Sequence, residues 1–322
     1  MKKQTVFILI LMLTTLFSCK NDRKFPEVKN LSEFKNTQFI PTLEHEISND
    51  INSVYCATLL FAWDEIKRQI NSPLIISEEF FDLKLLNQST SYINVLNTDE
   101  YSASGLVEGE LISARAEFKK SLPFESKLQS FKNQLIFDGQ KVISFGVRGH
   151  DSYKQLRIVK IIYYENDMNF IIKLQPKNNE HEIILFKTDQ VFNSIAEMNS
   201  EIEQLTEIGK TEIKNESINW KYYINEDDEI IIPIFNFNIE TNYSALEESS
   251  LKSGKKIFGI EQVWQRTAFI LDEYGAEIES EAEVSVAEEI AVEYVKPHPK
   301  KMIFDKPFLI LLKRVDNKNP YF

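Results

Sequence analysis

The spacing of apolar residues predicts helices in the first third of the chain. Three early segments carry apolar residues at helical spacing without an internal breaker, and one more follows later. The first of them is apolar on almost every face up to Asp64, so we expect its first turns to be buried. The helices are expected at Val54–Ile70, Glu78–Leu86, Glu108–Lys119 and Val191–Ile208.

After Ser121 the pattern changes to runs that are typical of strands. Asp138-Gly139 lies between two short apolar runs and predicts a tight hairpin. Pro233 lies inside a long apolar run and indicates an edge or bulge position, because proline has no amide hydrogen to donate. Strands are expected at Gln134–Phe137, Lys141–Phe145, Leu156–Tyr164, Asn169–Leu174, Glu182–Phe186, Glu229–Ile239, Glu261–Leu271 and Lys301–Leu312. Helices followed mostly by strands predict an α+β fold with large antiparallel or mixed sheets.

The first residues have the features of an export signal. Two lysines precede the apolar run Val6–Phe17, which is too short to span a bilayer. The sequence Leu16-Phe17-Ser18-Cys19 resembles a bacterial lipobox, in which the cysteine becomes the lipidated N-terminus. An ordinary signal that is cut elsewhere is the alternative. We therefore expect residues 1–18 to be a lipoprotein signal peptide and Cys19 to hold the protein on the bacterial cell envelope.

The next segment, Lys20–Asn49, is polar, contains two prolines and lacks sustained periodicity. We expect residues 19–49 to form a lipidated tether and residues 50–322 to form the folded domain. With Cys19 acylated, Cys56 has no cysteine left with which to form an intramolecular disulfide. Because Cys56 lies in an apolar segment, we expect a buried and inert thiol.

The charge of the chain limits its partners. Its 37 lysines and arginines against 49 acidic residues give a net charge of −12, which argues against a nucleic-acid partner. The four histidines lack metal-ligand spacing, and there is no Gly-rich phosphate loop or nucleophile elbow. His150-Asp151-Ser152 fits a polar turn better than a catalytic triad. We therefore expect a monomer that is not an enzyme, with no cofactor, no metal and no catalytic residue.

A long acidic segment precedes the last apolar strands. Phe269–Ala287 reads FILDEYGAEIESEAEVSVA, so an apolar run turns at Gly275 and then alternates glutamate with small or apolar residues. In an extended chain, alternate residues face opposite sides. One face would carry Ala276, Ile278, Ser280, Ala282 and Val284, and the other Glu277, Glu279, Glu281 and Glu283. An ordinary strand with an acidic outer face is the simplest interpretation of this segment alone.

The flanking residues add a family resemblance. Val263–Ala282 resembles the serpin segment that runs from a strand into the hinge of the reactive loop, with an acidic residue, a glycine and then small residues in order. Met302–Leu312 resembles the strand after that loop, and Asp316–Phe322 resembles the closing turn. The similarity extends in order back to Leu122-Pro123-Phe124 and is strongest over the last ninety residues.

The resemblance implies a serpin-like fold with an exposed reactive-centre-like loop at about 276–300. It implies that this loop is bait for a serine or cysteine protease, and that its hinge inserts into a central sheet after cleavage. The scissile bond would lie within Ala287–Val292, with Glu289-Ile290 as the central candidate. The hinge would comprise Glu273, Gly275, Ala276, Glu277, Ile278, Ser280 and Ala282.

The N-terminal half departs from the family. Between Ile70 and Lys120 the chain is too short for the full set of helices and central strands. One alternative is therefore a non-inhibitory serpin fold that binds a protein or a small ligand on the envelope. Another is a lipoprotein whose similarity is restricted to the C-terminal sheet. In each case the expected partner is a protease or another protein, with membrane contact through the lipid anchor only.

Overall fold

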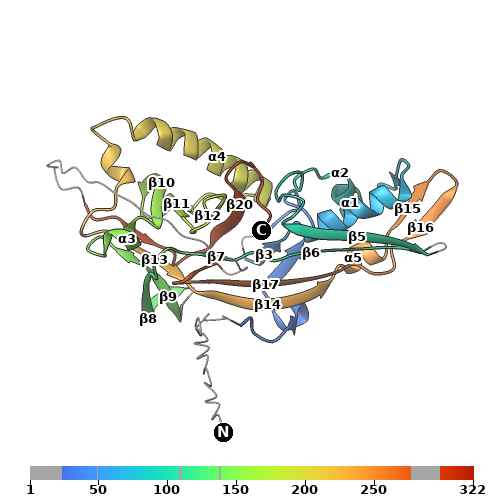
Figure 1. The fold of residues 1–322 in the computed structure, drawn as a ribbon, viewed down its shortest axis with the longest axis horizontal. Coiled ribbons are helices and arrows are strands. Elements are labelled where there is room, and N and C mark those ends of the chain that lie inside the picture. The colour runs from blue at the N-terminus through green and yellow to red at the C-terminus, as the bar shows by residue number, and fades with distance from the viewer. Residues whose placement is uncertain (1–23, 49, 109–110, 138, 277–297) are drawn as a thin grey trace, which may run out of the picture.

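Several long strands run along the long axis of the molecule in a computed structural model that describes residues 24–48, 50–108, 111–137, 139–276 and 298–322 (Figure 1). Strands β14 (Phe235–Asn242) and β17 (Trp264–Asp272) pair antiparallel over their whole length. Their inner faces carry aromatic side chains such as Phe269, which is buried in the main core. The two strands therefore form the frame on which the rest of the sheet is built.

Short strands complete the five-stranded sheet, whose order is β1-β14-β17-β18-β7. The first short strand, β1 (Lys29–Asn30), pairs parallel with β14 at one edge. At the other edge, β18 (Gly275–Ala276) lies between β17 and β7 (Leu122–Pro123). This second edge is where the acidic segment leaves the described part of the chain.

Two four-stranded sheets form the other half of the molecule. The order β10-β11-β12-β20 is antiparallel throughout. Its central strands β11 and β12 are mostly buried, whereas the edge strand β10 alternates buried with exposed residues. Helix α4 (Ile195–Glu212) packs on β10 (Figure 1) and begins at Ser194, whose side chain accepts a hydrogen bond from Glu197 N. The strands are β10 (Val159–Asn166), β11 (Asn169–Leu174), β12 (His181–Lys187) and β20 (Phe308–Arg314).

The second four-stranded sheet has the order β19-β13-β9-β8. Its strands are β19 (Lys301–Ile303), β13 (Glu229–Pro233), β9 (Gln140–Arg148) and β8 (Gln129–Phe137), and the short helix α3 (Tyr153–Leu156) follows β9. Gly139 lies in the turn of the predicted β8–β9 hairpin with φ +76°, a conformation that glycine adopts without a steric cost. Strand β19 pairs parallel with β13 and receives the chain where it re-enters the described residues.

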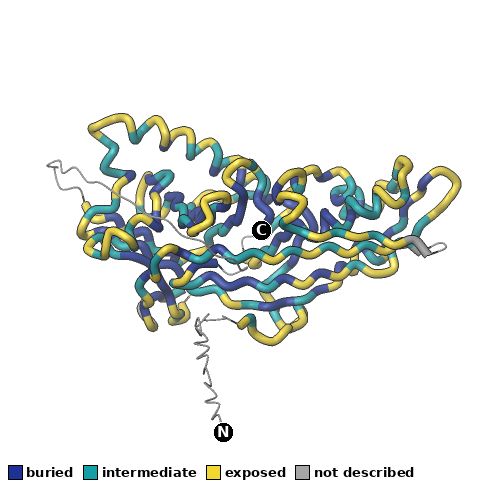
Figure 2. The backbone as a smooth tube through the Cα atoms, viewed as in Figure 1, coloured by how far each residue is buried: buried dark blue, intermediate teal, exposed yellow. Residues whose placement is uncertain are grey.

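The remaining helices and small sheets come mostly from the N-terminal part of the chain. Helix α1 packs on the two-stranded sheet β5–β6, and β4 pairs with the β15–β16 hairpin. These elements are β2 (Thr37–Ile40), β3 (Asn52–Tyr55), α1 (Thr58–Ile70), β4 (Ile75–Ile76), α2 (Phe81–Gln88), β5 (Tyr101–Glu108), β6 (Leu111–Phe118), α5 (Ser244–Glu247), β15 (Ser250–Ser253) and β16 (Lys256–Gly259), with 3-10 turns at Leu31–Glu33 and Asn219–Tyr222. Buried residues concentrate where these elements meet the long strands (Figure 2).

The predicted helix at Glu108–Lys119 is wrong. The segment belongs instead to the β5–β6 hairpin, whose residues alternate between half-buried and exposed. Ala114 and Ala116 face the core side, and Arg115 and Glu117 face solvent. This is the two-residue period of a strand, and residues with good helix propensity hide it in the sequence.

The predicted tether is wrong for most of its described part. Phe39, Ile40 and Leu43 are buried in the main core, and β2 pairs parallel with β3. Because residues 52–55 pair with β2, the first helix starts at Thr58 and not at Val54. The folded domain therefore begins at least as early as Lys29, where β1 joins the five-stranded sheet.

Two long predicted strands are each divided. The run Glu229–Ile239 crosses from β13 to β14, two strands of different sheets, at Ile234 just after Pro233. The run Lys301–Leu312 is broken between β19 and β20 at residues 304–307, where Pro307 has no amide hydrogen to donate. After β20 the chain returns to the core, because Tyr321 is fully buried and its carbonyl accepts a hydrogen bond from Ala57 N at 3.0 Å.

Candidate functional site

The chain enters the acidic segment through a tight turn at the end of β17. Asp272 pairs with Gly275, and Asp272 Oδ1 accepts a hydrogen bond from Tyr274 N at 2.8 Å. Gly275 has φ +121°, and a Cβ placed there would lie 2.4 Å from Leu122 O. Any other residue type would therefore be strained in conformation and would collide with a neighbouring strand.

Strand β18 is held on both sides. Ala276 pairs with Leu271 of β17 and with Leu122 of β7, and all three side chains are buried. The preceding turn is bound to the chain after β7, because Phe124 N donates to Tyr274 O at 2.8 Å. Gly275 and Ala276 thus lie inside the sheet, and their expected role in a hinge stays a prediction.

Glu273 lies at the tip of the turn and contacts a lysine from the same neighbouring segment. Its Oε1 is 3.5 Å from Lys127 Nζ, and that ammonium lies 4.6 Å from the centre of the Tyr274 ring. A hydrogen bond with Tyr274 and the charge of Glu273 raise the pKa of Lys127. Half of the Lys127 side chain is exposed, so solvent screens this contact and it stabilises the turn only weakly.

The chain returns to the described residues at His298 and is bound at once. Lys300 is fully buried and pairs with Asp228, and Lys301–Ile303 then form β19. The two fixed ends of the candidate loop are therefore Ala276, in the five-stranded sheet, and Lys300, beside the sheet that contains β13. Both ends are buried, and the segment between them is the one in which the family resemblance predicts a reactive-centre-like loop.

The remaining predicted site residues fall in the segments that the structure does not describe. These are Cys19, Glu277, Ile278, Ser280, Ala282, Glu289 and Ile290. The structure therefore locates Glu273, Gly275 and Ala276 of the predicted hinge and says nothing of the candidate scissile bond.

Sequence reasoning missed the residues that hold the two ends. Leu122 and Pro123 form β7, a strand too short to give any periodic signal. Asp228 and Lys300 are two charged residues 72 positions apart, and no local pattern marks either of them as buried. The sequence signal nearest to these contacts is the similarity at Leu122-Pro123-Phe124.

Within the described ranges, no group of three His, Cys, Asp or Glu side chains is arranged to hold a metal ion. His181 is buried against Glu100, with Nε2 and Oε1 2.9 Å apart. Burial and the nearby charge of Lys120 lower the pKa of His181, although Glu100 acts in the opposite direction.

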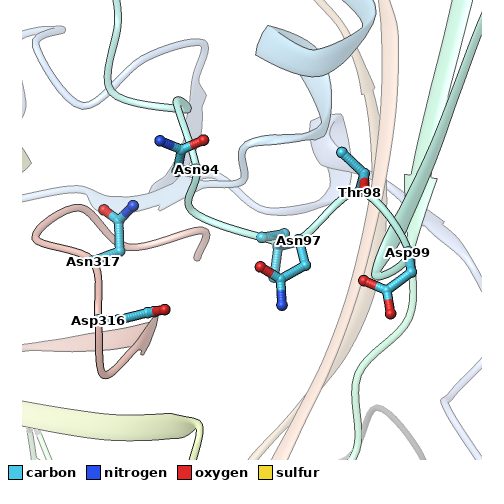
Figure 3. A pocket seen from close by; sticks show the side chains of 7 residues that line it. Asn94, Asn97, Thr98, Asp99, Asp316 and Asn317 are labelled. Atoms are coloured by element: carbon cyan, nitrogen blue, oxygen red, sulfur yellow. The ribbon is translucent and has the colours of Figure 1, made fainter.

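A cavity among the described residues lies away from the candidate loop and has a polar lining. Its volume is about 680 Å³, and Figure 3 shows side chains of the loop before β5 on one wall and of the turn after β20 on the other. No predicted site residue lines it. The lining residues are Asn94, Leu96, Asn97, Thr98, Asp99, Asp316 and Asn317.

In the part of the chain that the structure describes, no helix is both long and apolar enough to span a membrane.

Comparison with known proteins gives structural similarities only. No family model and no curated protein matches the sequence. Three solved structures similar to this chain are Serpin48, a highly specific serpin of the insect Tenebrio molitor, the thermophilic serpin Tengpin in its native state, and uncleaved ovalbumin. Their identities to this chain are 14%, 14% and 13%, and their TM-scores are 0.29, 0.32 and 0.32.

The aligned regions cover 74%, 74% and 84% of this chain but only 63%, 59% and 63% of those structures. The chain thus spans about three fifths of the length of the serpins to which it is similar. Serpin48 and Tengpin are named as serpins, the family that the C-terminal sequence resembles. Because every TM-score is below 0.5, they assign no role to any residue of this chain.

Proposed function

We propose that this chain is a serpin-like protein that presents the segment between Ala276 and Lys300 to a protease as an inhibitory loop. The proposal rests on one observation, which is the position of β18. Strand β18 pairs with only the last two residues of β17, Leu271 and Asp272. Among the described residues, Trp264–Ile270 of β17 have a strand partner only on the β14 side. A strand that continued from Ala276 would find an edge ready to pair.

The register of β18 defines which residues would meet along that edge. Ala276 is opposite Leu271, so antiparallel pairing would bring Ser280 opposite Thr267. Thr267 is buried, and its Oγ1 lies beside the Cys56 thiol, a weak hydrogen-bonding group, with no nitrogen or oxygen partner among the described residues. A serine hydroxyl at the opposing position could supply a stronger partner. Insertion would therefore improve the hydrogen bonding of a buried polar group.

The alternation of the acidic segment suits such a strand. In this register the small residues would face the core beside Leu271, and the glutamates would face solvent. Ile278 is the one bulky inward residue near the hinge, and it would lie opposite Phe269. Crowding there would cost about 1–3 kcal/mol, which is less than a strand of backbone hydrogen bonds at ~1 kcal/mol each would return.

The test is to mix the protein with a Glu-specific endoprotease and with an elastase, and to look for a covalent adduct on a denaturing gel. Two matched variants define the mechanism. Ser280→Arg adds a charged bulky side chain on the inward face, whereas Glu281→Arg adds the same side chain on the outward face. We expect the Ser280→Arg protein to be cleaved without forming an adduct, because insertion would bury an unpaired charge.

The Glu281→Arg protein is expected to form the adduct as the wild type does, provided that the protease still cleaves the loop. Equal adduct yields from the two variants would contradict insertion in the proposed register. Cleavage of the wild type without any adduct would instead support the second candidate function, a non-inhibitory binding protein.

A specific observation favours that second candidate. Among the described residues, β5 and β6 pair only with each other, and β7 extends the five-stranded sheet by just two residues. The far side of a newly inserted strand would therefore have little backbone to pair with unless β6 approached it. In this case the loop would serve as a recognition surface for another protein.

We also propose that Cys19 is lipidated and holds the protein on the bacterial envelope. The support is the lipobox-like sequence and the start of β1 at Lys29, ten positions after Cys19. The chain between anchor and domain is thus short, at most ~35 Å when fully extended. Mass spectrometry of the exported protein tests the modification, and Cys19→Ser should release the protein from the membrane fraction. An unmodified Cys19 in the exported protein would contradict the proposal.

A further inference from the structure

Two buried lysines converge on the short segment where the candidate loop ends. Lys300 belongs to this segment and is 0% exposed, and Lys187 of β12 is 2% exposed and reaches it from the neighbouring sheet. Fully buried lysines are rare, because taking an ammonium group out of water is costly unless it is paired. Both are paired here, Lys300 with Asp228 and Lys187 with Asp305, so each ion pair includes one residue of the segment 300–305.

Lys300 is bound to Asp228 by its main chain as well as its side chain. Lys300 Nζ lies 2.7 Å from Asp228 Oδ2, and Lys300 N donates to Asp228 Oδ1 at 2.7 Å. The carboxylate also accepts a hydrogen bond from Asn225 N at 2.8 Å. Lys300 Nζ donates to Trp220 O at 3.3 Å and lies 5.4 Å from the centre of the Trp220 ring. The buried Lys300 ammonium therefore has a carboxylate, a carbonyl oxygen and an aromatic ring as its partners.

Lys187 holds the other end of the same segment. Its Nζ donates to Ile303 O at 2.7 Å and to Asp305 Oδ1 at 2.7 Å. The ammonium lies 5.9 Å from the centre of the Phe170 ring, in a region of aromatic side chains. If residues 300–305 left this position, the Lys187 ammonium would keep only the 3.5 Å hydrogen bond to Asp167 O, and the Asp228 carboxylate only the one from Asn225 N. Both charges would then lack an ionic partner in a low-dielectric interior.

The other end of the loop is held in a different way. Gly275 and Ala276 are bound through main-chain pairing with β17 and β7, and the ion pair between Lys127 and Glu273 at the turn is partly exposed. Main-chain hydrogen bonds can form between any two strand edges, whereas a buried ion pair needs its particular partner. The two ends therefore differ in how readily they can rearrange.

We propose that Asp228 and Lys187 are positioning residues that fix residues 300–305 as the immobile end of the candidate loop. Any rearrangement of the loop then takes place from the Ala276 side. This proposal rests on the proposed function for its biological meaning, but the anchor itself can be measured without a protease target.

The test compares two adjacent carboxylates that differ in burial. Asp228→Asn removes the charge that faces Lys300, and Glu229→Gln removes the charge that faces Lys301 Nζ at 3.1 Å on the partly exposed side. Both changes replace a carboxylate by an amide of similar shape. Hydrogen exchange of the Met302, Ile303 and Phe304 amides is measured in the full chain, with the amides of β11 as the internal reference.

For Asp228→Asn we expect these amides to exchange at least tenfold faster than in the wild type, and trypsin to cleave after Lys301 at least tenfold faster. For Glu229→Gln we expect both rates to stay within twofold of the wild type. The proposal is overturned if the two variants behave alike, or if β19 exchange in Asp228→Asn rises no more than that of β11. A purely structural role would raise both strands together.

Should Asp228→Asn fail to fold, Lys187→Met provides the same measurement from the other end. Its control is Lys173→Met, which removes a lysine paired with Glu182 at 3.0 Å on the neighbouring strand β11. Lys187→Met should accelerate exchange at Phe304 by at least tenfold relative to its control, and equal rates would overturn the proposal. In this arm the amides of β14 serve as the reference, because Lys173 lies in β11.

The outcome separates the anchor from inhibition. If the wild type forms no adduct but Asp228→Asn frees β19, the anchor stands and the inhibitory function does not. If the wild type forms an adduct and Asp228→Asn leaves β19 exchange unchanged, the inhibitory function stands and the anchor does not.

Discussion

At Gly275 the backbone conformation and the space around Cα both require the absence of a side chain. The φ of +121° and the 2.4 Å distance from an added Cβ to Leu122 O are independent constraints. The sequence indicated a turn at this glycine from its place between an apolar run and an acidic one. It could not indicate the close approach of β7, because the two segments are 153 positions apart (275 − 122).

Gly275→Ala should therefore lower the free energy of unfolding by at least about 1–3 kcal/mol, the usual cost of a strained backbone position. Urea denaturation of the two proteins measures the difference. Gly254→Ala is the matched control for conformation alone, since Gly254 has φ +59° but nothing within 4 Å of an added Cβ. A loss at Gly275 no larger than at Gly254 would show that the approach of β7 does not matter.

His181 gives the protein a dependence of stability on pH. Burial lowers its pKa in the folded state below the ordinary 6.5, so the unfolded chain binds a proton more readily. Stability from this group is fully present above pH 6.5 and is lost as the pH falls through the folded pKa. Burial opposes the charge on Glu100, but hydrogen bonds from Lys120 and the Asn97 amide lower its pKa to about 2.

The free energy of unfolding should therefore fall as the pH drops from 7 to 5.5, before the Glu100 contribution begins to be lost near its unfolded pKa of about 4.5. Denaturation curves at the two pH values test this. In His181→Gln the slope over that interval should become shallower. An unchanged slope would mean that other groups account for it.

At the scale of elements, β7 has only two residues but pairs with β18 along its outer side. Leu122 is buried and lies opposite Ala276, so it closes the outer side of β18. Strands such as Asn169–Leu174 were predicted with correct bounds because a continuous apolar run between turns identifies them. A two-residue strand has no period, and the β5–β6 hairpin was mistaken for a helix, so the surroundings of β18 could not be derived from the sequence.

Leu122→Ala should cost about 2–5 kcal/mol of stability, which is typical for removing a buried leucine side chain. It should also accelerate hydrogen exchange at the Ala276 amide of β18 more than at the amides of β17. Leu106→Ala on the exposed face of β5 is the control, since Leu106 is 55% exposed and its loss should change stability by no more than about 0.5 kcal/mol. Slow exchange at Ala276 in Leu122→Ala would show that β17 alone holds β18.

At the scale of the whole molecule, the order of helices and strands predicted the α+β class correctly. The sequence could not reveal how the predicted strands divide among several sheets, because the breaks at Ile234 and at residues 304–307 fall inside continuous apolar runs. The start of the domain was also misplaced, since the polar residues around Phe39 and Ile40 concealed two buried side chains.

If loop insertion occurs, it is a whole-molecule event and should change global stability. Cleavage within the candidate loop should raise the melting temperature markedly in the wild type and leave it unchanged in Ser280→Arg. Differential scanning calorimetry before and after complete cleavage measures this. A melting temperature that falls on cleavage of the wild type would favour the non-inhibitory function.

The hydrogen bond from Ala57 N to Tyr321 O joins residues 264 positions apart (321 − 57) at the start of helix α1. During synthesis, the ribosome must therefore add Tyr321 before the first helix can complete its contacts. Contacts this distant in sequence form slowly, because a long loop has to close before they are gained. The native contacts around the start of α1 are therefore completed late, after the last strand and the residues that follow it have been synthesised.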